Sequence, residues 1–290
     1  MEKLTIVLFW LALVCGVTSS LAYIGNFAAK ADRRVHTYTA VGSALGAFTL
    51  LMAVIFVRAN TLGVDKTAGP FTMRIIFSAF IIGVFLLIES IYAGRNSKVK
   101  AFGMIVLPIS VILQFLAWHD YGLTEKLSNQ LRSYWVGIHV TFAVLAYASM
   151  TVALAMAIAY ILQERQLRAM REKKPGRIFR KLPSLEISDD LCHKAIAFSF
   201  TFLTLVVVTG IIRAEMLPQW SMWYRDSKII MAITTWLVYG SYLIVRTAFG
   251  WQGKRASMFA VVGFIVAIVT YLIGNTGLLP SIHSYGGGLG

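Results

Sequence analysis

The stretch that decides the fold is "YWVGIHVTFAVLAYASMTVALAMAIAYIL", residues 134–162. It contains no Asp, Glu, Lys or Arg, and it exceeds the roughly 20 apolar residues that cross the hydrocarbon core of a bilayer as a helix. A backbone inside lipid must satisfy its own hydrogen-bonding groups, so a run of this kind is expected to be helical. The stretch therefore predicts a transmembrane helix.

Similar apolar runs recur along the whole chain of 290 residues, of which 58% are hydrophobic and only 14% charged, with a mean hydropathy of +0.71. A soluble globular chain is nearer a quarter charged. The predicted fold class is therefore all-α: a polytopic membrane helix bundle with about eight transmembrane helices, forming a single integral membrane domain over residues 1–290. The predicted spans are 4–24, 36–57, 71–92, 101–118, 134–162, 192–212, 229–248 and 256–274.

The basic residues predict the orientation of the bundle. If both termini lie on one side, the loops on the opposite side are 25–35, 93–100, 163–191 and 249–255, and these loops hold most of the Lys and Arg found outside the spans. Positive charge collects on the cytoplasmic face, so both termini are expected on the outer (periplasmic or extracellular) side of the membrane. We interpret 163–191 as a basic cytoplasmic loop on anionic lipid, and the net charge of +14 does not indicate a nucleic-acid partner.

Ionisable residues inside the predicted spans are few. Arg74 and Glu89 lie near opposite ends of the third span, where long side chains reach the interface, and no Asp, Glu, Lys or Arg lies at mid-depth in any span. A proton pump or an ion-coupled transporter usually carries such residues, so both classes are disfavoured. Cys15 and Cys192 form no CxxC or CxxCH motif, which excludes a covalent c-type haem site.

The five histidines are the remaining candidates for chemistry, and the predicted topology sorts them. His139 near the outer end of the fifth span and His283 in the outer tail are placed to meet at the outer leaflet, while His36 and His193 are placed to meet at the inner one. Two neutral imidazoles facing across a helix bundle are a common axial pair for haem b, whereas zinc prefers four ligands. The competing interpretation is that the histidines of each pair are solvated, hydrogen-bonded side chains at the membrane interface and bind no cofactor. We interpret His119 as an ordinary loop residue.

Four stretches resemble a known family. They are "YWVGIHVTFAVLAYAS" (134–149), "LPSLEISDDLCHKAIAFSFTFLTLVVVTGII" (182–212), "DSKIIMAITTWLVYGSYLIVRTAFGWQGKRASMFAVVGFIVAIVTYLIGN" (226–275) and "SIHSYG" (281–286). Together they resemble the CcsA/ResC family, the haem-handling proteins of system II cytochrome c biogenesis. The resemblance covers about 134–286, which it marks as a haem-handling core.

The resemblance implies a role for the two outer histidines. His139 and His283 occupy the positions of the outer histidines that ligate haem in family members, and Trp135, one helical turn from His139, is placed to wall the same pocket. The glycines after His283 would let the tail bend over the outer end of the bundle. The family also implies a membrane partner of the ResB type and an outer c-type cytochrome as the recipient. It further implies a location in a bacterial (or plastid-like) inner or plasma membrane.

The sequence departs from the family pattern in the tryptophan-rich outer loop. The family has Trp-Gly-x-Tyr-Trp-x-Trp-Asp-Pro-Lys-Glu, where this chain has "QWSMWYRDSKII" (219–230). Trp220, Trp223 and Asp226 are retained as candidate pocket residues, while Arg225 replaces a tryptophan. Ile244 stands where many members carry an inner histidine.

These observations favour a haem b-binding assembly protein that hands haem to an exported apocytochrome. One alternative is an electron-transfer subunit that keeps one or two haems and works with a quinone; another is a scaffold without cofactor. The chain shows no nucleophile–base constellation or phosphate loop, and we interpret Asp189 and Asp190 as a helix-start signal. A stand-alone enzyme is therefore disfavoured.

Overall fold

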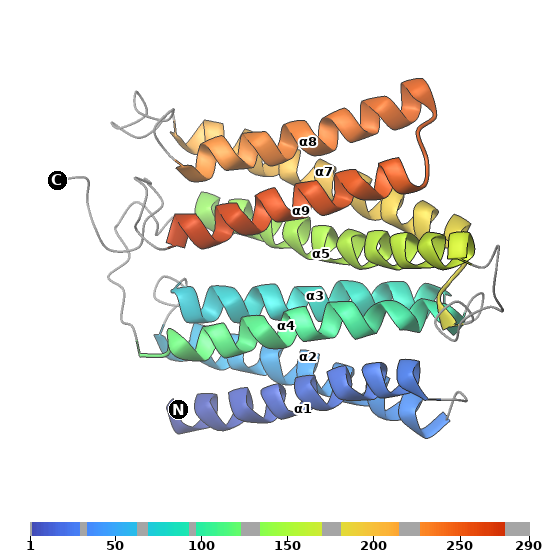
Figure 1. Cartoon of the computed structure of the whole chain (residues 1–290). Helices are drawn as coiled ribbons and strands as arrows, with labels where there is room; N and C mark the ends of the chain where they lie inside the picture. The colour runs from blue at the N-terminus through green and yellow to red at the C-terminus, as the bar shows by residue number, and fades with distance from the viewer. Residues whose placement is uncertain are drawn as a thin grey trace. The chain divides into compact units, whose positions relative to one another are not determined.

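The computed structural model describes residues 2–29, 34–62, 69–92, 97–122, 134–169, 181–214 and 227–275. Within these ranges the regular secondary structure is helical throughout, with no strand, which confirms the all-α prediction (Figure 1). The helices are α1 (Glu2–Ala28), α2 (Arg34–Leu62), α3 (Pro70–Tyr92), the 3₁₀ helix η2 (Ser97–Phe102), α4 (Gly103–His119), α5 (Tyr134–Ala169), α7 (Leu185–Ala214), α8 (Ser227–Phe249) and α9 (Lys254–Asn275).

Each predicted span overlaps one of these helices. Among the described residues, seven helices are long and apolar enough to cross a bilayer, and α9, with 22 residues, covers the eighth predicted span at about 33 Å of helix length. The chain is thus a multi-span membrane protein. The orientation of the two termini stays a prediction.

Two helices are longer than the apolar runs that predicted them. The 36 residues of α5 give about 54 Å of helix, well beyond the roughly 30 Å hydrocarbon core, and its last turns, up to Ala169, lie in the predicted basic loop. At the other end of that loop, α7 begins at Leu185, seven residues before the predicted span. The basic segment therefore starts and ends as helix.

The chain divides into two compact units, each with its own packing. The first contains Met1–Thr124 and Ala159–Ser188, and the second contains Glu125–Ile158 and Asp189–Gly290. Helices α5 and α7 each contribute residues to both. The sequence predicts that residues 1–290 form a single integral membrane domain. That would require the two units to pack together, and it stays a prediction.

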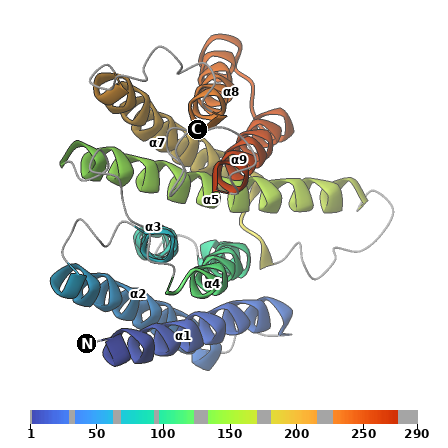
Figure 2. The same ribbon diagram turned by 90° about the vertical axis from the view of Figure 1, so that its left-hand side faces the viewer.

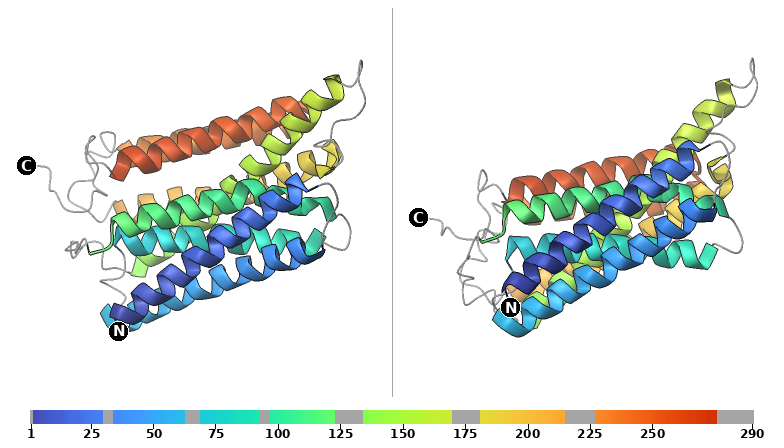
Figure 3. Two further views of the ribbon diagram at one scale, coloured as in Figure 1. Left: turned by 60° about the horizontal axis from the view of Figure 1, so that its bottom comes forward. Right: turned by 90° about the horizontal axis from the view of Figure 1, so that it is seen from below.

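The first unit is built around α1, α2, α3 and α4. Helix α1 packs on α2 and α4, and α3 packs on α2 and α4; Figure 2 views α3 and α4 nearly end-on, and Figure 3 shows α1 and α2 side by side. Small residues allow this close packing: a Cβ on Gly103 would lie 2.6 Å from the Tyr23 ring, and one on Gly83 would lie 3.0 Å from the Phe48 ring. Such small-residue contacts typify helix packing in membranes.

Polar side chains in the first unit are paired between helices. Gln114 of α4 donates a 2.9 Å hydrogen bond to Ser78 of α3, which donates to the Ser110 carbonyl. The other two pairings lie toward helix ends: Arg74 forms an ion pair with Asp120, and Tyr23 donates to the buried Glu89. The two ionisable residues of the third span, expected to reach the interface, therefore both have partners within the unit.

The second unit contains the first part of α5 with α7, α8 and α9. Ser199 of α7 donates to the Ala146 carbonyl of α5 at 3.0 Å, and the Trp236 indole of α8 donates to Thr204 of α7 at 2.9 Å. Helices α8 and α9 approach so closely that a Cβ on Gly263 would lie 2.1 Å from the Tyr239 ring. These contacts fix α7 against α5 on one side and α8 on the other.

Candidate functional site

His139 lies in the second turn of α5, and its partner is on α7. The ring Nδ1 of this half-buried side chain is 3.0 Å from the Thr209 hydroxyl oxygen. The same hydroxyl lies 2.6 Å from the Leu205 carbonyl of its own helix. The imidazole thus joins two helices of the second unit, as a cofactor ligand in a helix bundle commonly does.

The residue next to Thr209 limits the space around the His139 ring. A Cβ placed on Gly210 would lie 3.3 Å from His139 Cε1 and 3.8 Å from Nδ1. The first distance is tighter than ordinary carbon–carbon contact, so a larger residue would push against the ring. Two neighbouring residues of α7 therefore determine the position of the imidazole. Thr209 makes a hydrogen bond to the ring, and Gly210 leaves the space that the ring occupies.

Trp135 precedes His139 by one helical turn, which places the two side chains on the same face of α5. The Trp135 side chain is exposed, with 40% of its surface accessible. An interfacial aromatic belt would place a tryptophan here, and the role of Trp135 in walling a haem pocket stays a prediction.

Most of the other predicted outer-site residues lie outside the described residues. These are His283, Trp220, Trp223, Arg225 and Asp226. The pairing of His139 with His283 therefore stays a prediction, and so does the contribution of the outer loop to the pocket.

The predicted inner pair is described in part. His36 belongs to α2, but its side chain lies outside the described residues. His193 is described: its Nδ1 is 3.2 Å from the hydroxyl of Tyr242 on α8, and Tyr242 is almost fully buried. The meeting of His36 with His193 stays a prediction.

His119 ends α4, as expected for a residue at the edge of a loop. Its side chain is 85% exposed, and its Nδ1 lies 3.4 Å from Asp120. The Asp120 carboxylate is itself paired with Arg74. This arrangement makes His119 a suitable control for histidine substitutions.

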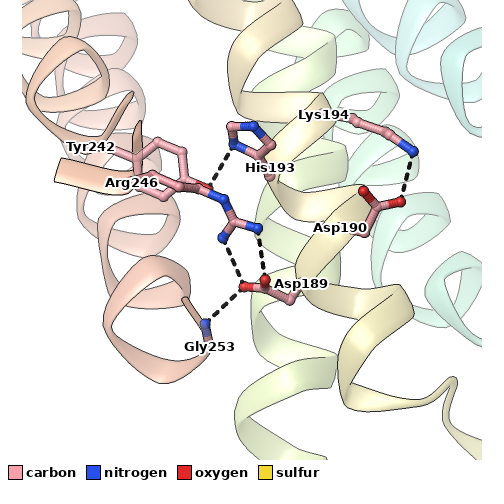
Figure 4. A network of polar contacts seen from close by, with 7 residues as sticks. All are labelled: Asp189, Asp190, His193, Lys194, Tyr242, Arg246 and Gly253. Carbon is pink, nitrogen blue, oxygen red and sulfur yellow. Dashed lines mark hydrogen bonds and ion pairs between the residues drawn. The ribbon is translucent and has the colours of Figure 1, made fainter. Parts of the chain in front are cut away.

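A polar network next to His193 was not predicted from the sequence (Figure 4). The Arg246 guanidinium of α8 donates two hydrogen bonds to the Asp189 carboxylate of α7, at 3.1 and 2.8 Å. The backbone N–H of Gly253, in the turn between α8 and α9, donates a third at 2.9 Å. Gly253 has a φ of 72°, which a residue with a Cβ rarely adopts. One carboxylate thus ties α7 to α8 and to the turn that follows it.

The interpretation of Asp189 and Asp190 as helix-start residues is wrong. Helix α7 begins at Leu185 with Glu186 in its first turn, so both aspartates lie inside the helix. Asp189 makes the contacts with Arg246, whereas Asp190 pairs with Lys194 one turn along. A signal was present in the sequence, because Asp189 and Arg246 are opposite charges at the same predicted side of two consecutive spans.

Among the residues that the structure describes, no three of His, Cys, Asp and Glu gather as a metal-binding group. The role of His139 as one of two axial haem ligands stays a prediction.

Comparison of the sequence with known proteins places the chain in a family. The sequence model of the cytochrome C assembly protein family matches residues 72–279. The cytochrome c biogenesis protein CcsA of Chlorella vulgaris is 29% identical, over 98% of this chain and 92% of its own length. The CcsA protein of Prochlorococcus marinus (strain MIT 9515) is 32% identical over 69% of each chain. No solved structure matches the chain.

The matched region includes α5, α7, α8 and α9, with the histidine on α5, its threonine partner on α7 and the Asp189–Arg246 pair. It covers well over half of the chain, and the resemblance seen in the motifs is confirmed. The chain belongs to the CcsA-type cytochrome c assembly protein family.

Proposed function

We propose that this chain is a haem b-binding membrane protein of cytochrome c assembly. In this proposal His139 and His283 ligate one haem near the outer face of the bilayer, and the haem passes to an exported apocytochrome c. The observation that carries the proposal is the half-buried His139 imidazole, held between α5 and α7 by its hydrogen bond to Thr209, in a chain of the cytochrome c assembly family.

Haem is the cargo in this proposal, and the residues of the chain bind and orient it. His139 would supply one axial nitrogen and His283 the other, while Trp135, Trp220 and Trp223 would offer flat apolar surface to the macrocycle. In the same outer loop, a guanidinium such as that of Arg225 can bind a propionate carboxylate in a bidentate manner, and Asp226 lies beside it in the sequence.

The partners follow from the same proposal. The CcsA relatives carry cytochrome c biogenesis in their names, so the recipient would be an exported apocytochrome c, and a ResB-like membrane protein would complete the complex. The helices of the described residues include seven long and apolar enough to cross a bilayer, which suits a subunit that meets its partner within the membrane.

Single substitutions test the haem site. We expect His139→Ala and His283→Ala each to abolish the absorbance of the bound haem in the purified chain, because each removes an axial ligand. His119→Ala is the matched control, since its imidazole is 85% exposed, and it should leave the spectrum unchanged. Normal spectra in both ligand variants would contradict the proposal.

A second pair of substitutions counts the haems. With one haem at the outer site, His36→Ala and His193→Ala should leave the amount of haem per chain unchanged. Loss of half of the haem in either variant would instead assign a second haem to the inner pair.

A cell lacking the chain tests the assembly role. We expect its exported c-type cytochromes to lack haem, and the wild-type chain but not His139→Ala to restore them. Cytochromes with normal haem content, together with impaired quinol oxidation, would overturn the assembly role in favour of electron transfer.

A further inference from the structure

The hydroxyl of Thr209 has one proton, and the geometry indicates where it points. The Thr209 oxygen lies 2.6 Å from the Leu205 carbonyl oxygen and 3.2 Å from that of Val206. A separation of 2.6 Å is at the short end of the range for an O–H···O hydrogen bond, and two oxygens this close would repel one another without a proton between them. Thr209 therefore donates to its own helix.

This leaves the Thr209 oxygen as an acceptor toward His139. The 3.0 Å contact between them then requires a proton on Nδ1 of the imidazole. A neutral imidazole carries one N–H, so the lone pair lies on Nε2. The hydrogen bond selects the tautomer whose Nε2 can bind a metal.

Gly210 adds a second constraint on the same ring. A Cβ at this position would lie 3.3 Å from His139 Cε1, so a larger residue would press on this edge of the ring and shift it. Gly210 therefore preserves the ring's position, while Thr209 fixes its proton.

His193 does not carry the same constraint. Its Nδ1 lies 3.2 Å from the Tyr242 hydroxyl oxygen, and a phenolic hydroxyl both donates and accepts hydrogen bonds. This contact is compatible with either tautomer of His193, so the geometry selects a tautomer for His139 alone of these two rings.

We propose that Thr209 and Gly210 are positioning residues that present Nε2 of His139 to the haem iron; the identity of the ligand rests on the proposed function. A hydrogen bond from the far ring nitrogen orients a ligating imidazole and raises its basicity, and the loss of such a bond costs about 10- to 100-fold in metal affinity. Thr209 acts through His139 and does not touch the iron.

The tautomer can be measured without haem. The chain has five histidines, so nitrogen-15 labelling of histidine with a non-histidine purification tag gives five imidazoles, and His139→Ala identifies the relevant one. At pH 8, where an ordinary imidazole is neutral, we expect the haem-free chain to show His139 protonated on Nδ1.

Two substitutions at Thr209 separate the hydroxyl from the shape of the side chain. Thr209→Val keeps the branched shape and removes the hydroxyl, so His139 should become a mixture of tautomers. Thr209→Ser retains the hydroxyl and should preserve the wild-type spectrum. A His139 protonated on Nε2 in the wild type, or an unchanged Thr209→Val spectrum, would overturn the proposal.

The haem-loaded chain gives a second readout. In Thr209→Val we expect haem affinity to fall about 10- to 100-fold and the reduction potential to rise, because a less basic imidazole stabilises ferric iron less; Thr209→Ser should restore both. Gly210→Ala should also weaken haem binding, whereas Gly42→Ala, with nothing within 4 Å of the added Cβ, should not.

These outcomes distinguish the two proposals. A wild-type chain that binds no haem would overturn the proposed function, while the nitrogen spectrum would still report the tautomer. A wild-type chain that binds haem with the same affinity and potential as Thr209→Val would overturn the positioning role and leave the proposed function standing.

Discussion

Asp189→Ala should destabilise the second unit far more than the same substitution at the next residue. The Asp189 carboxylate accepts two hydrogen bonds from Arg246 and one from the backbone of Gly253. Asp190 accepts one hydrogen bond from Lys194 on the same helix. The two aspartates are adjacent in sequence, so they form a matched pair.

The magnitude follows from burial and from the number of contacts. The side chains of Arg246 and Asp189 are only 14% and 12% exposed. Removing one partner of a buried pair costs about 3–5 kcal/mol, because the other charge is left uncompensated, and the residual exposure here points to the lower end, about 3 kcal/mol. The Lys194–Asp190 pair is 60% and 49% exposed, and exposed pairs of this spacing are worth about 0.3–0.5 kcal/mol.

The assay is reversible unfolding of the full chain in mixed micelles with increasing denaturing detergent, followed by circular dichroism. We expect the free energy of unfolding to fall about 2.5 kcal/mol more for Asp189→Ala than for Asp190→Ala, the difference between the two costs above. Adding Arg246→Met to Asp189→Ala should recover part of the loss, since no charge is then left alone. Equal losses in the two single variants would refute the reasoning.

Two further predictions concern packing and buried polar groups in the helices. Gly263→Ala should lower the free energy of unfolding by about 1–3 kcal/mol, because its Cβ would lie 2.1 Å from the Tyr239 ring. In a double-mutant cycle with Tyr239→Ala, losses that are less than additive would identify this contact as the cause. Ser78→Ala should cost about 1–3 kcal/mol by removing the acceptor of the buried Gln114 amide, and Ser78→Thr, which keeps the hydroxyl, should cost less if that bond is responsible.

The helices could be predicted because the bilayer imposes their length and apolarity. A run such as 134–162 has no other stable form in lipid, and the structure places α5 over it. The ends of helices were harder to predict. The segment before Cys192, residues 185–191, alternates apolar residues with four polar or acidic ones, which kept it out of the predicted span. Helix α7 nevertheless includes it from Leu185 onward, because Asp189 and Leu191 are buried by tertiary packing.

The candidate site could be predicted only in part. His139 stood out because it is an imidazole at the outer end of a span and matches a family motif. Its partner Thr209 could not be recognised from the sequence. Threonines in membrane helices commonly donate a hydrogen bond to their own backbone, so a threonine in a span does not indicate a contact with another helix. The contact of Asp189 with Arg246 likewise depends on the rotation of α7 against α8, which hydrophobicity alone does not determine.

The most direct test of the central claim is a pyridine haemochrome assay on the purified chain, with haem counted per polypeptide and compared with His139→Ala. The proposed function predicts one haem b per wild-type chain and none in the variant. A wild-type chain without haem, or a variant that retains the full amount, would contradict the assignment of His139 as a haem ligand.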